Sequence, residues 1–371
     1  MLILGLETSC DETAAAVVQD GTLVLSNVVA TQHDLHERYA GVVPEIASRA
    51  HLQRLMPVVQ DALAQANVNA TDLDAIAVGN RPGLVGSLIV GVSAAKALAW
   101  SLNKPLIGID HVRAHLHAAS LRHAGEPEKQ SPEHPSASDT HGPNNTYALG
   151  LVVSGGHTSL YQLGPNDLFV RLGRTIDDAI GEAYDKAGTL LEAGYPGGPN
   201  VDRLAQTGNP NGPDIPKLPV SMLAPDSLDF SFSGLKTALL YAVRGLPQGR
   251  GKAATSPRTA ADLTHTKRAD LAAAFQHAAI EAIMRKLKRA IKQTPPNTRY
   301  NALVVGGGVS ANSHLRERLI TFAQNEKLTL QLPAMAYCID NAAMIAGRAA
   351  TRLRANDIDD LNLPVIATSR T

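Results

Sequence analysis

The sequence has few of the residues that define several protein classes. Only two cysteines, Cys10 and Cys338, occur in 371 residues, and they lie far apart without a C-x-x-C spacing. This argues against a disulfide framework and against a thiolate zinc site. Aromatic residues make up only 4% of the chain, so the core must be built from Ala, Val, Leu and Ile.

Net charge and long apolar runs are also lacking. The 34 Lys and Arg residues balance 34 Asp and Glu residues, so any nucleic-acid surface must be a local patch. No apolar run approaches the ~20 residues of a membrane span, and we expect no membrane partner. Acidic residues come early, whereas the first basic residue is Arg38. Because leader peptides need early positive charge, we expect a cytoplasmic protein.

Short apolar runs alternate with helical patterns, which indicates an α/β fold. We expect strands at 2–6, 14–18, 23–29, 75–78, 106–109, 147–153, 159–163 and 302–305, and helices at 44–66, 84–102 and 336–354. Both halves open with strand, small polar turn and strand, which suggests a duplicated architecture with a cleft between the halves. The stretches at about 123–145 and 245–267 have few large apolar residues, and we interpret them as flexible insertions.

A histidine pair is the first candidate site. His111 and His115 are four residues apart, so a helix would place both on one face, within reach of one metal ion. In an H-E-x-x-H metalloprotease the second residue is the general base, but here it is Val112. Asp340 is a candidate third ligand, and two His with one carboxylate suit iron or zinc. Two surface histidines are the alternative.

Two glycine-containing turns follow expected strands. Successive N–H groups at Ser154–Thr158 could bind an anion, and Gly306–Gly308 leads from a strand into a helix, where phosphates bind. Ordinary tight turns are the alternative. No G-x-x-x-x-G-K-[ST] motif is present, so the chain is not a P-loop enzyme. Asp185 and Asp202 flank a Pro/Gly-rich loop, and their carboxylates could accept hydrogen bonds from ribose hydroxyls. A solvated helix face and loop are the alternative.

Positive charge is concentrated around a basic segment that we expect to be helical, formed by Arg285, Lys286, Lys288, Arg289 and Lys292. From Arg244 to Lys292 there are eleven Lys or Arg residues against three acidic residues. In a chain without net charge, this asymmetry suggests a surface for a phosphate backbone. A solvated helix face is the alternative.

Taken together, these motifs resemble one family, the universal tRNA threonylcarbamoyladenosine transferases. The matching motifs lie, in order, at 7–13, 111–115, 152–158, 181–186, 195–199, 230–237, 306–312 and 340–346. So many motifs in register are far more specific than any one of them. The chain departs from the family at Arg81, since a Gly-Pro-Gly usually stands where this sequence has Arg81-Pro82-Gly83.

The resemblance implies a fold and a reaction. The fold is the actin/Hsp70-like (ASKHA) fold, an α/β duplication with two lobes around a central nucleotide cleft. We expect one lobe at 1–110 joined by about 338–371, and the other at 111–337. The reaction transfers a threonylcarbamoyl group from threonylcarbamoyl-adenylate to N6 of adenosine 37 in tRNAs that read ANN codons, and AMP leaves.

The resemblance also implies site residues. The metal ligands fall on His111, His115 and Asp340, with iron expected and zinc as the alternative. The substrate-binding positions fall on Val152, Val153, Ser154, Gly155, Gly156, Asp185, Gly198, Asp202 and Asn312. Adenine N6 is a poor nucleophile, so a nearby base would help, and Glu12 is our candidate for it, with a structural cap as its alternative.

The implied partners are tRNA, a smaller paralogous subunit and a P-loop ATPase subunit. Two other functions compete with the transferase. A metal-dependent glycoprotein endopeptidase is disfavoured by Val112, because that enzyme needs a Glu there. A non-catalytic nucleotide-binding scaffold would not need a metal triad.

Overall fold

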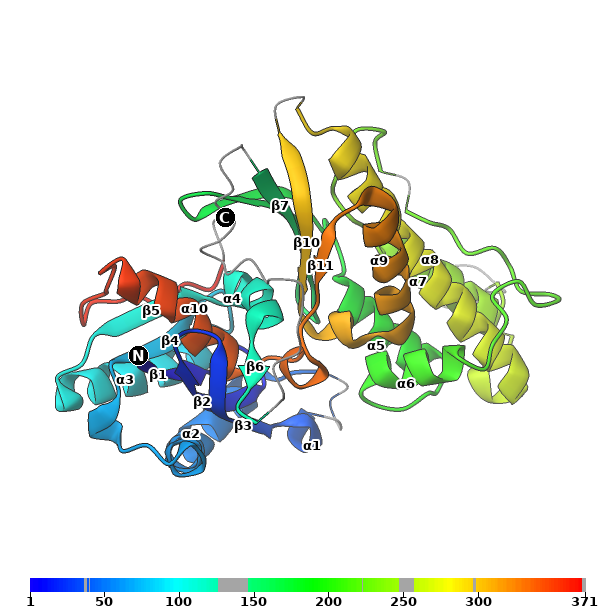
Figure 1. Ribbon diagram of the computed structural model, residues 1–371. Coiled ribbons are helices and arrows are strands. Elements are labelled where there is room, and N and C mark those ends of the chain that lie inside the picture. The colour runs from blue at the N-terminus through cyan, green and yellow to red at the C-terminus, as the bar shows by residue number, and fades with distance from the viewer. Residues whose placement is uncertain are drawn as a thin grey trace. The chain divides into compact units, whose positions relative to one another are not determined.

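The sequence folds into two units, each built on its own β-sheet (Figure 1). The computed structural model describes residues 1–36, 39, 41–125, 146–221, 223–246, 257–295 and 298–368. Unit 1 comprises residues 1–139 and 331–371, and unit 2 comprises residues 140–330. The expected lobe boundaries were 110/111 and 337/338, so the unit boundaries lie elsewhere, and His111, His115 and Asp340 all belong to unit 1.

Unit 1 contains a mixed sheet with the strand order β5-β4-β1-β2-β3-β6. Its strands are β1 (Leu2–Glu7), β2 (Glu12–Gln19), β3 (Leu23–Thr31), β4 (Ala75–Arg81), β5 (Leu106–Asp110) and β6 (Arg122–His123). The first three form antiparallel pairs, whereas β4 and β5 run parallel to β1. The expected strands of this part of the chain are confirmed.

Successive residues along each strand of this sheet point to opposite faces, and each face packs in its own hydrophobic core. Ile3, Ala14 and Ala16 pack with helix α10 (Ala342–Arg354) and with Ala114 of α4 (His111–His117). Leu4 belongs to the core with α2 (Pro44–Ala66) and α3 (Val85–Leu102), on the other face. The sheet is therefore covered on both faces, and α4 is fixed in unit 1 by its buried side.

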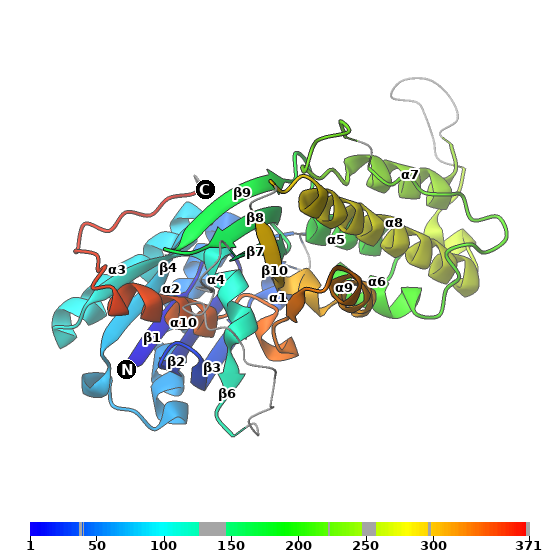
Figure 2. The same ribbon diagram turned by 45° about the horizontal axis from the view of Figure 1, so that its top comes forward.

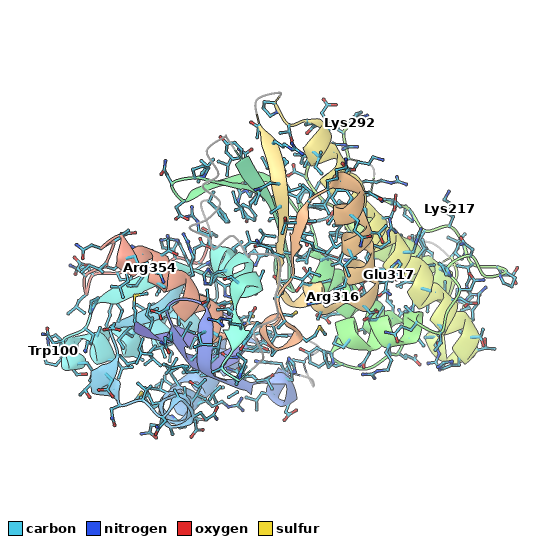
Figure 3. All side chains as sticks on the ribbon, in the orientation of Figure 1. Trp100, Lys217, Lys292, Arg316, Glu317 and Arg354 are labelled. Carbon is cyan, nitrogen blue, oxygen red and sulfur yellow. The ribbon has the colours of Figure 1, made fainter. Side chains whose placement is uncertain are left out.

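Helix α3 is the one described helix that is long and apolar enough to cross a membrane by length and composition. One face of it is buried, including Leu88, Val92 and Ala95, and it packs against α2 and β4. Trp100, near its end, is 75% exposed (Figure 3). A helix that packs one face into a protein core meets the same criterion, so the evidence for a membrane span is weak.

Unit 2 repeats the strand order of unit 1 as β11-β10-β7-β8-β9. Its strands are β7 (Thr146–Val153), β8 (Thr158–Gly164), β9 (Leu168–Arg174), β10 (Arg299–Gly306) and β11 (Thr329–Gln331). Here too the first three strands are antiparallel, and β10 runs parallel to β7. The same order in two sheets confirms the expected duplication.

The helices of unit 2 pack around one long member. They are α5 (Ile180–Leu190), α6 (Gly197–Ala205), α7 (Ser233–Arg244), α8 (His265–Lys292) and α9 (Ser313–Glu326). Helix α8 contacts α6, α7 and α9, and Figure 2 shows α7 and α8 side by side. Because it has neighbours on several sides, α8 is buried over most of its length.

The two expected insertions are only partly described. Residues 126–145 and 247–256 lie outside the described residues. Within 245–267, Ala260–Asp262 forms a 3-10 turn with Ala260 buried, and α8 already begins at His265. Ordered sequence therefore resumes earlier than the composition indicated. The expected last helix also differs, since α10 begins at Ala342.

Candidate metal centre and substrate-binding turns

The histidine pair is presented by a short helix that follows directly on a buried strand. Asp110 ends β5 and caps α4, with its carboxylate accepting hydrogen bonds from the N–H groups of Val112 (2.9 Å) and Arg113 (3.2 Å). The cap fixes the first turn, so His111 and His115 lie on one helix face, as expected. Their ring centroids are 4.5 Å apart, and both residues are buried.

Asp340 completes the cluster from a turn just before α10. Its Oδ1 lies 3.5 Å from Nε2 of His111 and 3.2 Å from Nε2 of His115. Asn341 caps α10 through its side chain, which accepts from the N–H of Met344, so the helix cannot extend back to Asp340. The carboxylate is thereby held in the turn, where it faces both imidazoles.

The cluster fits a divalent metal ion. Ligand atoms about 2.0–2.2 Å from one ion lie roughly 3–3.5 Å apart, which matches the distances between Asp340 and the two imidazoles. Among the described residues, neither ring nitrogen of the fully buried His115 has a hydrogen-bond partner of good geometry. Buried polar nitrogens are normally satisfied. An ion between His111, His115 and Asp340 would satisfy Nε2 of His115.

Glu7 is a residue of this centre that sequence reasoning did not identify as functional. It is fully buried at the end of β1, and its Oε2 lies 3.1 Å from Nδ1 of His111, while Oε1 accepts from the N–H of Ser9 (2.6 Å). A carboxylate on the second nitrogen of a metal-binding imidazole orients the ring and strengthens the ligand. A charged residue ending an apolar strand was the available signal.

The charges of the centre set the pKa values of its histidines. Burial alone would lower the pKa of His111, but the carboxylates of Asp340 and Glu7 raise it to about 9. For His115, burial lowers the pKa, and the neighbouring His111 lowers it further. The two carboxylates therefore favour positive charge at this site, and a bound metal ion would supply that charge.

Glu12, the candidate base, begins β2 in the same unit. It is buried, and its Oε1 lies 3.6 Å from Nε2 of His33. Burial raises its pKa, and the nearby charges of Asp11 and Asp340 raise it further. Glu12, His33 and Asp11 also form a second group with closely spaced ligand atoms.

In unit 2, the first glycine turn lies between β7 and β8. Val152 and Val153 end β7 in the core, and the N–H of Ser154 donates to the carbonyl of His157 (2.7 Å). Gly155 and Gly156 are exposed, and a β-carbon on either would meet nothing within 4 Å. The backbone of this turn is therefore open to a ligand.

The N-terminus of α5 packs against this turn. The N–H of Gly181 donates to the carbonyl of Ser154 (3.2 Å). A β-carbon at Gly181 would lie 2.7 Å from that same oxygen and from Cα of Gly155. Only glycine allows α5 to approach the turn so closely. The dipole of α5 then adds positive potential at the turn, because the N-terminus of the helix points toward it.

The second glycine turn lies beside the first, because β10 and β7 are parallel neighbours in which Gly306 pairs with Val152. Gly307 has a φ of 96°, which favours glycine, and a β-carbon there would clash with the carbonyl of Val153. Gly308 faces open space. Both turns thus end neighbouring strands at one edge of the sheet, where ligands of α/β folds bind.

The remaining expected substrate-binding residues lie on the helices of unit 2. Oδ1 of Asp185, on α5, accepts from the N–H of Gly198 (3.2 Å) at the start of α6, and a β-carbon on Gly198 would face open space. Asp202 accepts from the N–H (3.0 Å) and hydroxyl (2.9 Å) of Ser313, at the start of α9. The side chain of Asn312 caps α9 and donates to Gln276 (2.9 Å). Asp202 and Asn312 therefore both organise the start of α9.

Comparison with known proteins decides the family. Residues 23–347 match the model of the family described as tRNA N6-adenosine threonylcarbamoyltransferase. A protein with that name from Sorangium cellulosum is 45% identical over 98% of this chain and 95% of its own length. Another from Trichlorobacter lovleyi is 46% identical over 99% and 96%. The chain belongs to the tRNA N6-adenosine threonylcarbamoyltransferase family. It is a transferase that places a threonylcarbamoyl group on N6 of adenosine in tRNA.

A solved structure supports the fold. The crystal structure of T. kodakarensis HypF matches 94% of this chain and 47% of its own length, with a TM-score of 0.54 and 15% identity. The actin/Hsp70-like duplication expected from the sequence is confirmed, and the endopeptidase and scaffold alternatives are not favoured. The cleft between the lobes stays a prediction.

Proposed function

We propose that His111, His115 and Asp340 hold one divalent metal ion, iron or zinc, that this transferase needs for its reaction. The donor is threonylcarbamoyl-adenylate, the acceptor is N6 of adenosine 37 in tRNAs that read ANN codons, and AMP is the product. The single observation that carries the proposal is the close approach of these three side chains, whose ligand atoms all lie within 4.8 Å of one another.

The chemistry of the donor explains why positioning is enough. A mixed carbamoyl–phosphoryl anhydride is already activated, so it needs orientation and charge stabilisation rather than a covalent nucleophile. A bound ion supplies Lewis acidity toward the carbamoyl or carboxylate oxygens. Glu7 holds the His111 ring through Nδ1, which leaves Nε2 directed toward Asp340.

We propose that unit 2 binds the adenylate part of the donor. The N–H groups of Gly155 and Gly156 would donate to the phosphate, while Val152, Val153 and Ser154, whose own N–H donates to His157, would hold the turn in place beneath it. Support comes from the open faces of both glycines and from the N-terminus of α5 beside them. Asp185 and the backbone of Gly198 would form hydrogen bonds with the ribose hydroxyls of the adenylate.

Asp202 and Asn312 would act on the same ligand from the start of α9, as the resemblance implies. Glu12 is proposed as the base for adenine N6. A carboxylate with a raised pKa is a stronger base than an exposed one, and burial raises the pKa of Glu12.

The experiment compares the amount of threonylcarbamoyladenosine in tRNA from strains whose only copy of the gene carries one substitution. We expect His111→Ala and Asp340→Asn to abolish the modified nucleoside, measured by mass spectrometry, while the variants stay folded. His123→Ala is the control, because His123 is exposed and lies outside the cluster. Full modification with His111→Ala would overturn the metal's role.

We further propose that the protein works in the cytoplasm with a smaller paralogous subunit and a P-loop ATPase subunit. An exposed apolar face on unit 1 supports a subunit partner. It is formed by Leu52 and Met56 of α2 and by Val85 and Ile89 of α3, each at least 45% exposed. Helices α2 and α3 pack against each other, and we propose that the smaller paralogous subunit covers these exposed residues.

A further inference from the structure

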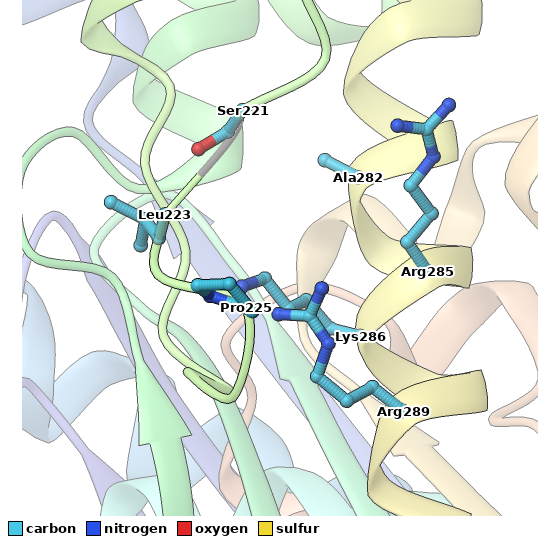
Figure 4. Close-up of a pocket in the computed structure, with 7 residues that line it drawn as sticks. All are labelled: Ser221, Leu223, Pro225, Ala282, Arg285, Lys286 and Arg289. Carbon is cyan, nitrogen blue, oxygen red and sulfur yellow. The ribbon is translucent and has the colours of Figure 1, made fainter. Parts of the chain in front are cut away.

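A basic pocket in unit 2 is not used by the proposed reaction. It lies between helix α8 and the segment that contains Ser221, Leu223 and Pro225, and Figure 4 shows Lys286 and Arg289 reaching toward Pro225, while Arg285 lies one turn away on α8. The cavity has a volume of about 280 Å³. Its lining residues are Ser221, Leu223, Pro225, Ala282, Arg285, Lys286 and Arg289. The α8 residues follow a spacing of three and four, so they share one helix face.

Two of the cations are held close together. Nζ of Lys286 and Nη1 of Arg289 both donate to the carbonyl of Ser227, each at 2.7 Å. Lys286 is only 3% exposed, and neither cation forms an ion pair with a carboxylate in the part of the chain that the structure describes. Burial lowers the pKa of Lys286, and Arg289 lowers it further. Nη1 of Arg289 also donates to the carbonyl of Ala224 (3.3 Å), so both positive charges face only neutral carbonyls among the described residues and can still attract an anion.

Arg285 is the third cation, and the two terminal nitrogens of its guanidinium group can donate hydrogen bonds to a ligand. Its Nε pairs with Oε1 of Glu281 (3.0 Å), and it is half exposed. Within the described residues, its two terminal nitrogens have no partner. Glu281 also pairs with Arg318 (2.9 Å), so its charge is shared. A guanidinium with two free donors in a fixed plane suits an anion with paired oxygens, such as a phosphate.

We propose that this basic pocket binds a phosphodiester of the tRNA backbone. The inference rests on tRNA being the substrate of the proposed function, since tRNA brings many phosphates to the protein surface. Arg285 would supply the paired donors at the mouth, and Lys286 and Arg289 would supply the positive potential behind it. Such a contact positions the RNA and carries no sequence information.

The test measures binding of a fluorophore-labelled tRNA to the full-length protein by anisotropy at several salt concentrations. Arg285→Gln is the informative variant, because the bond that Arg285 forms among the described residues is with Glu281 on its own helix, so the substitution should leave the loop in place. We expect its tRNA affinity to fall about tenfold at low salt. The slope of log affinity against log salt should shrink by about 0.7–0.9, as for one lost phosphate contact. Arg285→Lys should restore the slope but only part of the affinity.

Lys288→Gln is the matched control, because Lys288 is exposed on the same helix, carries the same charge and does not line the pocket. Equal losses for Arg285→Gln and Lys288→Gln would overturn the proposal in favour of diffuse surface charge. An unchanged tRNA affinity for Arg285→Gln would also overturn it. So would calorimetry in which Arg285→Gln weakens binding of inorganic phosphate or AMP but not of tRNA.

The two proposals fail separately. His111→Ala should bind tRNA as the unaltered protein does, because the pocket is built from unit 2 alone. If that variant also modifies tRNA fully, the metal proposal is wrong and the pocket proposal stands. If modification depends on His111 while Arg285→Gln binds tRNA normally, only the pocket proposal is wrong.

Discussion

Glu7 is the residue whose role depends most on the fold. It is separated from His111 by 104 positions in the sequence, yet its carboxylate lies 3.1 Å from the imidazole. A motif search finds the His pair because both residues are local. It cannot find Glu7, because that contact arises only when β4 places β5 near β1 in the sheet. Ligands were therefore predictable, while the group that orients them was not.

Replacing Glu7 tests this role. We expect Glu7→Gln to bind the metal about 10–100-fold more weakly, because an amide does not strengthen the His111 ligand as a carboxylate does. The affinity is measured by competition with a chelator of known affinity. Gln can still accept the hydrogen bond from Ser9, so the fold should be kept and circular dichroism should be unchanged. An affinity equal to that of the unaltered protein would contradict the role of Glu7.

At the scale of elements, the bounds of α2 were predictable and those of α10 were not. Helix α2 starts with Pro44, which suits a first turn, and ends before Asn67, whose left-handed φ of 52° stops the helix. For α10, the pattern continues back to 336, but the capping side chain of Asn341 starts the helix at Ala342. The cap formed by Asn341 therefore decides where Asp340 lies, and the apolar periodicity of the sequence does not reveal that cap.

Substitutions at two glycines distinguish effects on folding from effects on ligand binding at the first turn. Gly181→Ala would push α5 away from Ser154, and we expect a loss of about 1–3 kcal/mol in the free energy of unfolding. Gly155→Ala meets no atom within 4 Å and should unfold as the unaltered protein does. We expect Gly155→Ala to weaken adenylate binding, measured by calorimetry, because its methyl group would occupy space that the phosphate needs. Normal binding by Gly155→Ala would argue against the phosphate role.

Asp178 joins two helices of unit 2 and should give the fold a pH dependence. Its carboxylate accepts from Lys186 of α5 and Lys236 of α7, each at 2.8 Å. Burial alone would raise the pKa of Asp178, but these two lysines lower it. A lowered pKa means that its stabilisation is present above the unfolded value of about 3.9 and is lost as the pH falls through the folded value.

We expect Asp178→Asn to lower the free energy of unfolding at pH 7 by about 1 kcal/mol, after allowing for solvent screening of the lysines. The difference from the unaltered protein should vanish in acid, which urea unfolding at several pH values measures. Glu182→Gln is the control. It removes an exposed pair with the same Lys186 and should cost only a few tenths of a kcal/mol. Equal costs for both variants would contradict the bridging role of Asp178.

At the scale of the whole molecule, the duplication was visible in the sequence because each half opens with the same strand pattern. The limits of the halves were not visible. Helix α4 follows β5 without a break, so its buried Ala114 keeps it in the core of unit 1, and composition gives no sign of that. The opening of α8 was also hidden, since His265 and its neighbours are as polar as the preceding stretch.

The exposed apolar face of unit 1 predicts how the molecule assembles. We expect Leu52→Asp to weaken binding of the smaller paralogous subunit at least tenfold without lowering the melting temperature, because Leu52 is 70% exposed. Sedimentation or calorimetry with the purified subunit measures the affinity. Ile320→Asp, on α9 of unit 2, is the control, since Ile320 is also exposed. Unaltered binding by Leu52→Asp would place the partner elsewhere.

The metal content of the purified protein tests the central claim most directly. Elemental analysis of the full-length protein and of Asp340→Asn and His115→Ala, prepared side by side, gives the number of ions per chain. The account predicts about one iron or zinc ion per chain for the unaltered protein and almost none for either variant. One ion per chain in all three proteins would contradict it.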